Sequence, residues 1–261
     1  MTNAIKLTAD RPSKSRIRQS FERAAPTYDS AASVQRTICQ QLIGCLSPDL
    51  KPKSVLDAGC GTGYALALLH SRFPDATTLA LDLSPAMLQR ISSPCARLAG
   101  DLDHLPLAAA SLDLYWSSLA VQWCDLVKVL HEARRVLRPD GQLAIASLGP
   151  ATFHELRLAF ADVDDYQHTL GFHTPVEIEA MTRSAGFATV DLKNSTETAH
   201  YPDFKTLLRA VKAIGANQIG DGKRTSLMPR SAFSRAESAF EKLRTANGLP
   251  LTYDVITLTA H

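Results

Sequence analysis

The chain of 261 residues contains no uninterrupted apolar run of about 18 residues, the length that a helix needs to cross a bilayer. Its amino terminus also lacks the apolar stretch that is typical of a secretory signal. These two absences predict a cytoplasmic protein that does not use a membrane as its partner.

Cysteine is scarce and its spacing is uninformative. The sequence has five cysteines, an odd number, and no two of them form a C-x-x-C pair: Cys39, Cys45, Cys60, Cys95 and Cys124. This usage predicts reduced thiols rather than a disulfide framework or a metal site. Basic stretches interleaved with aromatic residues are missing as well, so we do not expect a nucleic-acid partner.

Three glycines in five residues are the most informative feature that is present. Gly59, Gly61 and Gly63 follow an apolar segment that ends near Asp57, and a helix-like run follows them. Strand, glycine-rich turn and helix together place a ligand at the carboxyl edge of a sheet, and the helix amino terminus suits an anion. Tyr64 stands where the G-x-G-x-x-G pattern of dinucleotide binders requires a glycine.

The D-x-G-x-G-x-G pattern resembles the cofactor loop of class I methyltransferases that use S-adenosylmethionine (SAM). Asp82 ends a second strand-like segment about 20 residues later, at the distance from which an acid binds ribose hydroxyls. Asp101 ends a third, and the resemblance implies that it meets the adenine amino group. The resemblance assigns to cofactor binding Asp57, Gly59, Gly61, Gly63, Asp82, Leu83, Met87, Asp101, Leu102 and Ser117.

Strand-like and helix-like segments alternate along the chain, which predicts an α/β fold with a parallel sheet covered by helices on both faces. The expected strands begin at residue 54 and then span residues 77–82, 96–101, 111–118, 142–148, 186–192 and 251–258. The resemblance implies a Rossmann-like, seven-stranded, mostly parallel sheet whose last strand is antiparallel, with helical lids. We expect a single domain, 1–261, with a lid (1–45), a SAM-binding core (50–195), a helical insert (196–248) and a final strand (249–261).

Further motifs carry a closer resemblance. The patterns R-A-A-x-x-Y-D at residues 23–29, L-G-P-x-T-F-x-E-L-R at 148–157 and I-G-A-N at 214–217 are spread over most of the chain. Together they resemble the malonyl-[acyl-carrier protein] O-methyltransferases of biotin synthesis. The resemblance implies transfer of a methyl group from SAM to the free carboxylate of a malonyl thioester, which gives the methyl ester.

Such a reaction needs no metal and no general base, because a carboxylate is already ionised at neutral pH. The site needs a cation to gather the carboxylate, and Arg157 is the candidate because arginine can hold a carboxylate with two hydrogen bonds. Tyr28 is expected to cover the methyl group, and Phe153 and His168 to line the malonyl pocket. We expect Trp123 to pack at the edge of the core rather than to touch a ligand.

The net charge of +2 is unevenly distributed. Residues 1–25 carry +4 and residues 203–247 carry +5, which leaves −7 for the remainder. The second basic stretch includes Arg209, Lys212, Lys223 and Arg224 and is expected to bind an acidic acyl-carrier protein, although malonyl-CoA remains possible. The sequence gives no indication of the oligomeric state.

Three alternatives stay open at this level. The acceptor of a SAM-dependent methyltransferase could be another small carboxylate or a ring carbon. The glycine loop could belong to an NAD-type oxidoreductase, or to a protein that binds SAM without turnover.

Overall fold

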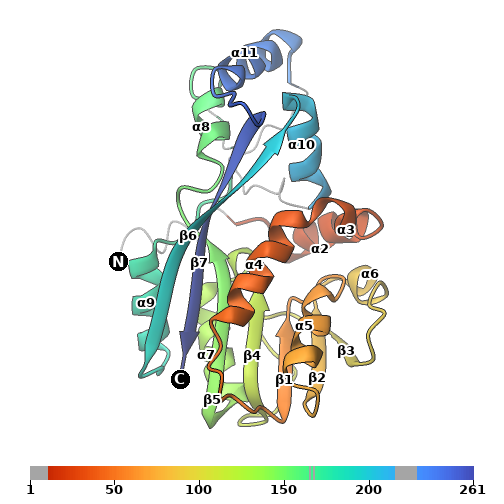
Figure 1. The fold of residues 1–261 in the computed structure, drawn as a ribbon, viewed down its shortest axis with the longest axis vertical. Coiled ribbons are helices and arrows are strands. Elements are labelled where there is room, and N and C mark those ends of the chain that lie inside the picture. The colour runs from red at the N-terminus through yellow and green to blue at the C-terminus, as the bar shows by residue number, and fades with distance from the viewer. Residues whose placement is uncertain (1–10, 165, 167, 215–227) are drawn as a thin grey trace.

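The computed structural model describes residues 11–164, 166, 168–214 and 228–261. A seven-stranded sheet with strand order β3-β2-β1-β4-β5-β7-β6 forms its centre (Figure 1). The strands are β1 (Ser54–Ala58), β2 (Thr77–Asp82), β3 (Ala96–Ala99), β4 (Leu112–Ser118), β5 (Leu137–Leu148), β6 (Val190–Tyr201) and β7 (Leu249–Ala260). Only β7 is antiparallel to its neighbours β5 and β6, which confirms the expected fold.

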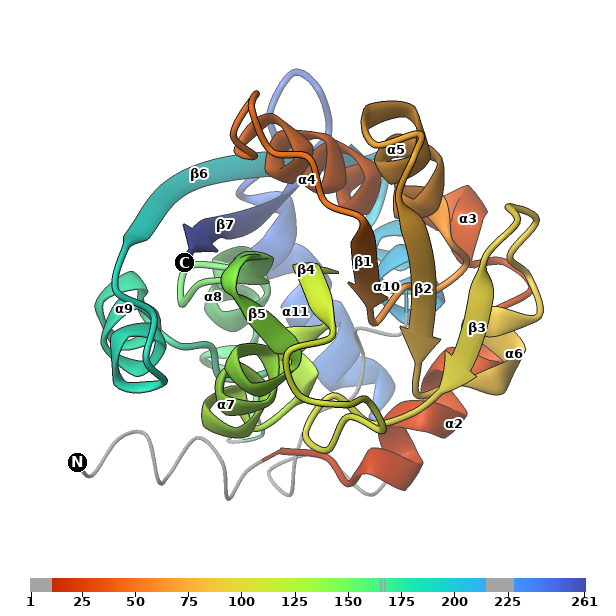
Figure 2. The ribbon, with the colours of Figure 1, turned by 90° about the horizontal axis from the view of Figure 1, so that it is seen from below.

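Helices cover both faces of the sheet, as expected. The described helices are α2 (Lys14–Ala24), α3 (Tyr28–Ala31), α4 (Ser33–Gly44), α5 (Tyr64–Arg72), α6 (Pro85–Leu88), α7 (Leu126–Val136), α8 (His154–Phe160), α9 (Pro175–Ser184), α10 (Phe204–Ala213) and α11 (Arg230–Glu241). Helices α4 and α5 lie on one face and α7 and α9 on the other (Figure 2). None of the helices in the described ranges combines the length and apolarity needed to span a membrane.

The alternation of side chains along β4 divides the core into two layers. Leu114 and Trp116 are fully buried on the face that also holds Ile38 and Leu42 of α4. Tyr115, between them, is buried on the opposite face with the apolar side of α7. Helix α4 therefore belongs to the core layer, although it falls within the lid expected for residues 1–45.

Strands β6 and β7 form a long antiparallel ribbon that extends beyond the rest of the sheet (Figure 1). They pair from Val190 and Ala260 to Tyr201 and Leu249, whereas β5 pairs with β7 only as far as Val255. The expected start of the insert at residue 196 therefore falls inside a strand. The sequence did not show this because β6 is an exposed edge strand with little apolar alternation.

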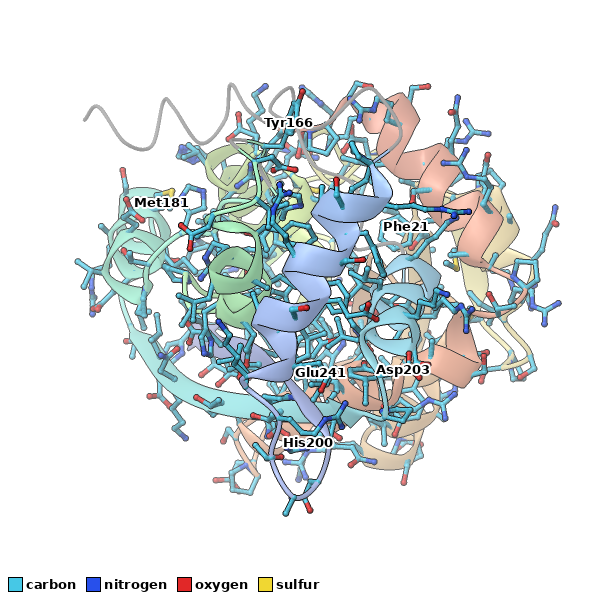
Figure 3. All side chains as sticks on the ribbon, turned by 90° about the horizontal axis from the view of Figure 1, so that it is seen from above. Phe21, Tyr166, Met181, His200, Asp203 and Glu241 are labelled. Atoms are coloured by element: carbon cyan, nitrogen blue, oxygen red, sulfur yellow. The ribbon has the colours of Figure 1, made fainter. Side chains whose placement is uncertain are left out.

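The extended part of this ribbon carries the helices above the carboxyl edge of the sheet. Helix α10 follows β6, and α11 precedes β7. The two helices contact each other, and α8 packs against α11. Figure 3 looks onto this end of the molecule, where Tyr166, Asp203 and Glu241 are labelled. Helices α8, α10 and α11, which we call the roof, thus lie over the sheet edge that bears the glycine loop.

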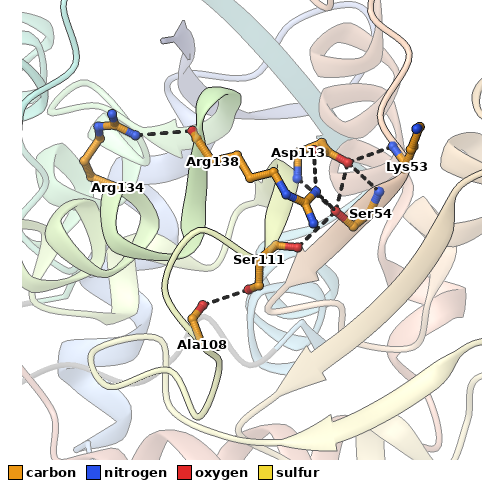
Figure 4. Close-up of polar contacts among 7 residues, drawn as sticks. All are labelled: Lys53, Ser54, Ala108, Ser111, Asp113, Arg134 and Arg138. Carbon is orange, nitrogen blue, oxygen red and sulfur yellow. Dashed lines mark hydrogen bonds and ion pairs between the residues drawn. The ribbon is translucent and has the colours of Figure 1, made fainter.

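The opposite edge of the sheet is held together by one carboxylate. Asp113 Oδ2 accepts hydrogen bonds from the backbone N–H groups of Lys53 and Ser54 and from the Ser54 hydroxyl, each at 2.9 Å (Figure 4). Its Oδ1 pairs with Arg138, which lies in the segment looped out between Leu137 and the next paired residue of β5. Residues 138–141, between Leu137 and Gln142, thereby tie β5 to β1 and β4.

We predict that Asp113→Asn lowers the free energy of unfolding at neutral pH by roughly 1–3 kcal/mol, the scale of lost hydrogen bonds to a charged group. Burial opposes ionisation, but Arg138 and Ser54 hold the pKa of Asp113 below its usual value. This stabilisation is present above the carboxyl's unfolded pKa and is lost as the pH falls through the lower folded pKa. Denaturation in urea at several acidic pH values should show the two proteins converging.

Asp140→Asn, at an exposed carboxylate in the same looped segment, is the matched control and should leave the unfolding free energy nearly unchanged. If the stability difference between Asp113→Asn and the wild type is constant from neutral to acidic pH, the charge of Asp113 is not what stabilises this edge.

Candidate cofactor and acceptor site

The glycine loop after β1 adopts a conformation that side chains would oppose. Gly59, Gly61 and Gly63 all have positive φ angles, of 75°, 54° and 88°. A Cβ atom on Gly59 would lie 2.2 Å from the Cβ of Ala120, so only glycine fits there. A Cβ on Gly61 would meet nothing within 4 Å, because the loop borders a cavity at that point.

Asp82 connects this loop to the segment after β2. Its Oδ2 accepts a hydrogen bond from Gly61 N at 2.9 Å, and its Oδ1 accepts one from Ser84 N at 2.7 Å. Burial raises the pKa of Asp82, while the two backbone donors act in the opposite direction. The carboxylate thus orients both loops and lines the cavity between them.

Asp57 is the second acid of the loop, and it is buried and only 2% exposed. Its Oδ2 is buried with no hydrogen-bond partner among the described residues. Burial, followed by the nearby Asp82, raises the pKa of Asp57 to about 8. A buried carboxylate oxygen without a donor is costly unless a ligand supplies one, so this position fits a cationic group.

One continuous cavity lies above β1, β2 and β4 and below α2. It is lined by Lys14, Ile17, Phe21, Tyr28, Gly59, Gly61, Asp82, Leu83, Met87, Asp101, Leu102, Ser118, Leu119, Ala120, Trp123 and Cys124. A second space adjoins this cavity beside Asp57. Both spaces are lined by Tyr28, Gly59, Gly61 and Ser118. We call these two spaces together the cofactor cavity.

Ser117 does not line this cavity, which corrects one prediction. Its side chain is fully buried, and its hydroxyl donates to the carbonyl oxygen of Ala58 at 2.7 Å. Because successive residues of a strand point to opposite faces, Ser118 faces the cavity instead. Gly63 also lies outside the lining residues and serves as the left-handed residue before α5.

Tyr28 lines the cofactor cavity and also a second cavity next to it. Phe21 and Trp123 lie at the same boundary, with their rings edge to face and 5.7 Å apart. Trp123 is therefore a cavity residue, which corrects the expectation that it packs at the edge of the core. Burial raises the pKa of Tyr28, so its hydroxyl keeps its proton at neutral pH.

The second cavity, which we call the acceptor chamber, is mostly apolar. It is lined by Phe21, Tyr28, Gln35, Leu119, Gln122, Trp123, Leu148, Phe153, Leu170, Phe172, Ile214 and Tyr253. Phe153 lines this chamber and lies edge to face with Tyr253 at 4.9 Å. Gln35 and Gln122 each have a buried side-chain oxygen that accepts no hydrogen bond within the described ranges. The chamber thus offers polar atoms in an apolar enclosure.

Arg157 and His168 line a third cavity, which meets the acceptor chamber at Leu170 and Phe172. The Arg157 guanidinium donates to the carbonyl oxygens of Thr152 at 2.6 Å and Pro150 at 2.7 Å. His168 is paired with Asp164 at 2.7 Å and stacks on Phe160. Neither residue is among those lining the cofactor cavity or the acceptor chamber.

The turn that carries Phe153 and Arg157 is shaped by β7. Asp254 accepts a hydrogen bond from Ala151 N at 3.0 Å, and a Cβ on Gly149 would lie 2.4 Å from an Asp254 carboxylate oxygen. Glu155 bonds to Thr252 rather than to Arg157. The L-G-P-x-T-F-x-E-L-R motif is thus anchored by β7, and its arginine extends into the third cavity.

The expected basic group is only partly described. Arg209 and Lys212 are exposed on α10, whose last turn is followed by Ile214 of the acceptor chamber. Helix α10 also contacts α3, the helix that begins with Tyr28. Lys223 and Arg224 lie outside the described residues.

Several lining residues were not foreseen from the sequence, among them Lys14, Phe21, Gln35, Ser118, Gln122 and Tyr253. Phe21 stands beside the R-A-A-x-x-Y-D motif, and that proximity was the available signal. Gln35 and Tyr253 come from segments more than 200 residues apart, and nothing in their local pattern distinguishes them from core residues.

Comparisons with known proteins agree with this geometry. Residues 56–145 match a family model described as a methyltransferase domain. The protein named YcgJ from Bacillus subtilis has a similar fold, with a TM-score of 0.60 and 15% identity, over 86% of this chain and 97% of that one.

Proteins with similar sequences identify the family within the methyltransferases. A malonyl-[acyl-carrier protein] O-methyltransferase of Dechloromonas aromatica is 70% identical over 100% of this chain and 99% of its own. A biotin biosynthesis bifunctional protein BioHC of Cellvibrio japonicus is 37% identical over 94% of this chain and 49% of its own. With its glycine loop and paired cavities, this chain belongs to the malonyl-[acyl-carrier protein] O-methyltransferase family of SAM-dependent methyltransferases.

Proposed function

We propose that this chain transfers the methyl group of SAM to the free carboxylate of malonyl-acyl-carrier protein and so forms the methyl ester used early in biotin synthesis. The observation that carries the proposal is the acceptor chamber, which adjoins the cofactor cavity at Tyr28. Membership of a family whose members are named for this reaction supports the choice of acceptor.

The cofactor cavity fits SAM group by group. The unpartnered Oδ2 of Asp57 suits the α-ammonium, and the glycine loop suits the methionyl carboxylate. Asp82 is placed to accept from the ribose hydroxyls, and Asp101, with Leu83, Met87 and Leu102 around it, to accept from the adenine amino group. When bound, SAM supplies a methyl group on a positively charged sulfur, which is already a good leaving group.

The chain's own residues align and enclose the acceptor rather than activate it. The malonyl carboxylate is ionised at neutral pH and attacks the methyl carbon without a base, so positioning is the main catalytic contribution. The protonated Tyr28 hydroxyl can donate to one carboxylate oxygen and leave the other for the methyl group. Phe21, Trp123 and Phe153 exclude water, which favours a step that cancels two opposite charges.

Arg157 supplies the cation that gathers the carboxylate as it enters from the third cavity. Its guanidinium donates to two carbonyl oxygens and, at 3.4 Å, to Thr169 Oγ1, and the residue lines that cavity. His168 lies in the same cavity and forms part of the entry. Methylation removes the negative charge, so the ester loses its attraction for Arg157 and is released.

The first experiment is incubation of the protein with SAM and malonyl-acyl-carrier protein, followed by mass analysis of the carrier. We expect a gain of one methyl group, lost again after ester hydrolysis. If the carrier stays unmodified while another small carboxylate or a ring carbon is methylated, the acceptor is not malonyl-acyl-carrier protein. If the protein binds SAM without any turnover, it is not an enzyme for this reaction.

We predict that binding of S-adenosylhomocysteine releases a proton from Asp57. Below its pKa of about 8 the free Asp57 is mostly protonated, whereas an ammonium favours its ionised form. Affinity should therefore rise by up to about tenfold per pH unit as the pH approaches 8 from below. Calorimetry in buffers of different ionisation enthalpy measures the released proton directly.

Asp57→Asn should weaken binding and abolish the proton release. Asp29→Asn is the matched control, because it removes an exposed carboxylate from the rim of the same cavity and should keep the release. Proton release that persists in Asp57→Asn would assign the titration to another group.

We predict that Arg157→Ala lowers malonyl turnover severely, by about a hundredfold or more, while SAM affinity stays within about twofold. Arg157→Lys should restore only part of the rate, because an ammonium cannot reproduce the planar two-point contact. Steady-state kinetics with saturating SAM, together with calorimetry for the cofactor, separate the two effects. Native turnover in Arg157→Ala would show that a different group gathers the carboxylate.

Docking of the acidic carrier protein is assigned to α10. Arg209 and Lys212 are exposed and three residues apart, so they lie on the same side of the helix. The helix stands beside the acceptor chamber through Ile214, which suits a partner whose flexible arm must reach inside. Lys223 and Arg224 belong to the same proposed basic surface by their position in the sequence alone.

We predict that the double change Arg209→Glu and Lys212→Glu raises the KM for malonyl-acyl-carrier protein about fivefold or more and leaves malonyl-CoA turnover nearly unchanged. Added salt should slow the wild-type carrier reaction, because charge steering is screened beyond about 8–10 Å. Lys193→Glu, at an exposed lysine on β6, is the control. Equal losses with both substrates would place the two residues in the folding of the roof instead.

A further inference from the structure

Lys14, the first residue of α2, reaches into the cofactor cavity and meets two acids there. Its Nζ lies 2.7 Å from Asp101 Oδ1 and 3.0 Å from Asp103 Oδ2. The side chain of Asp103 is only 10% exposed, and that of Lys14 is 31% exposed. The Sγ atom of Cys124 lies in the same cluster, within 4.8 Å of a carboxylate oxygen of each acid. Lys14 thus occupies the centre of a small, largely enclosed cluster.

The cluster would be unstable without a cation. Ligand atoms of Asp101, Asp103 and Cys124 all lie within 4.8 Å of one another, close enough for the two carboxylates to repel each other strongly. Burial disfavours the charged lysine, yet Cys124 and the two acids raise the pKa of Lys14 above its usual value. The ammonium therefore stays charged and holds the acids together at neutral pH.

The contacts determine how Asp101 is oriented. Oδ1 accepts hydrogen bonds both from Lys14 Nζ and from Asp103 N, the latter at 3.1 Å. In the described part of the chain Oδ2 accepts none, and Asp101 lines the cofactor cavity. Two donors on one oxygen fix the plane of the carboxylate and leave the other oxygen for a donor on a ligand.

The same residue fastens a helix that covers the cavity. Helix α2 places Ile17 and Phe21 in the cavity wall, and its last turn packs through Ala24 against Met87 of α6. Figure 2 shows α2 beside α6, near the end of β3. At the other end of α2, Lys14 holds the helix through its ion pairs with Asp101 and Asp103.

We propose that Lys14 is a positioning residue for the adenine end of the cofactor: it turns Asp101 toward the exocyclic amino group and fastens α2 over the bound cofactor. The proposal rests on the SAM site proposed above. It assigns to the segment before the R-A-A-x-x-Y-D motif a part in cofactor recognition, separate from the carboxylate chemistry of the acceptor.

The test compares two ligands that differ at one position of the base. S-adenosylhomocysteine has the amino group that donates to Asp101, whereas S-inosylhomocysteine has a carbonyl oxygen there. Calorimetry should show that the wild type binds the adenosyl ligand about tenfold or more tightly, the scale of one hydrogen bond to a charged group. In Lys14→Met this preference should fall to about threefold or less, as Asp101 loses its orientation.

Three further variants make the result specific. Asp101→Ala should show the same loss of preference as Lys14→Met, and Lys14→Arg should keep most of it because the cation remains. Arg18→Met removes an exposed cation that pairs with Glu22 on the same helix, so it should keep the wild-type preference. Thermal unfolding without ligand checks the fold of each variant, and Lys14→Gln substitutes for Lys14→Met if the latter does not fold.

The outcomes separate the two proposals. Failure of the wild type to bind either ligand would overturn the SAM site itself, and this inference with it. If the wild type discriminates and Lys14→Met does so equally well, Lys14 does not orient Asp101. If Lys14→Met weakens both ligands by the same factor, Lys14 acts on helix closure alone and the orientation of Asp101 is set by other groups.

Discussion

The hydrogen bonds that Asp82 accepts from Gly61 and Ser84 are the interaction on which the site depends. They hold the loop after β1 and the loop after β2 in one arrangement at the carboxyl edge of the sheet. The glycine loop can take that arrangement because its positive φ angles cost a glycine little. With these loops fixed, Asp57 of β1 and Asp101, just after β3, face the same cavity from either side of β2.

Above this edge, the ribbon of β6 and β7 gives the protein its second cavity. The ribbon extends past β5 and carries α10 and α11, while Asp254 of β7 anchors the turn that bears Phe153. The acceptor chamber is therefore assembled mainly from the helices before β1, the segment after β4, the turn after β5 and the last strand. Its residues come from the two ends and the middle of the chain.

Charge is distributed according to the proposed chemistry. Carboxylates surround the part of the cavity assigned to the cationic cofactor, and burial keeps the hydroxyl of Tyr28 protonated where the two cavities meet. The acceptor chamber is mostly apolar, and the cations lie at its approaches, with Arg157 in the adjoining cavity and Arg209 on the outside. An anion would thus be attracted to the entrance and desolvated inside.

The sequence by itself determined the succession of strands and helices along the chain, the glycine loop, and the acids at the ends of β1, β2 and β3. It could do so because local patterns encode strands, turns and their ends. It did not determine that Ser118 rather than Ser117 faces the cavity, since a shift of one residue reverses the face of a strand. Nor did it place Trp123 in a cavity wall or extend β6 to Tyr201. Those features, and the meeting of Lys14 with Asp101 and Asp103, were decided by the tertiary structure, because they depend on contacts between residues that are distant in sequence and carry no local periodicity.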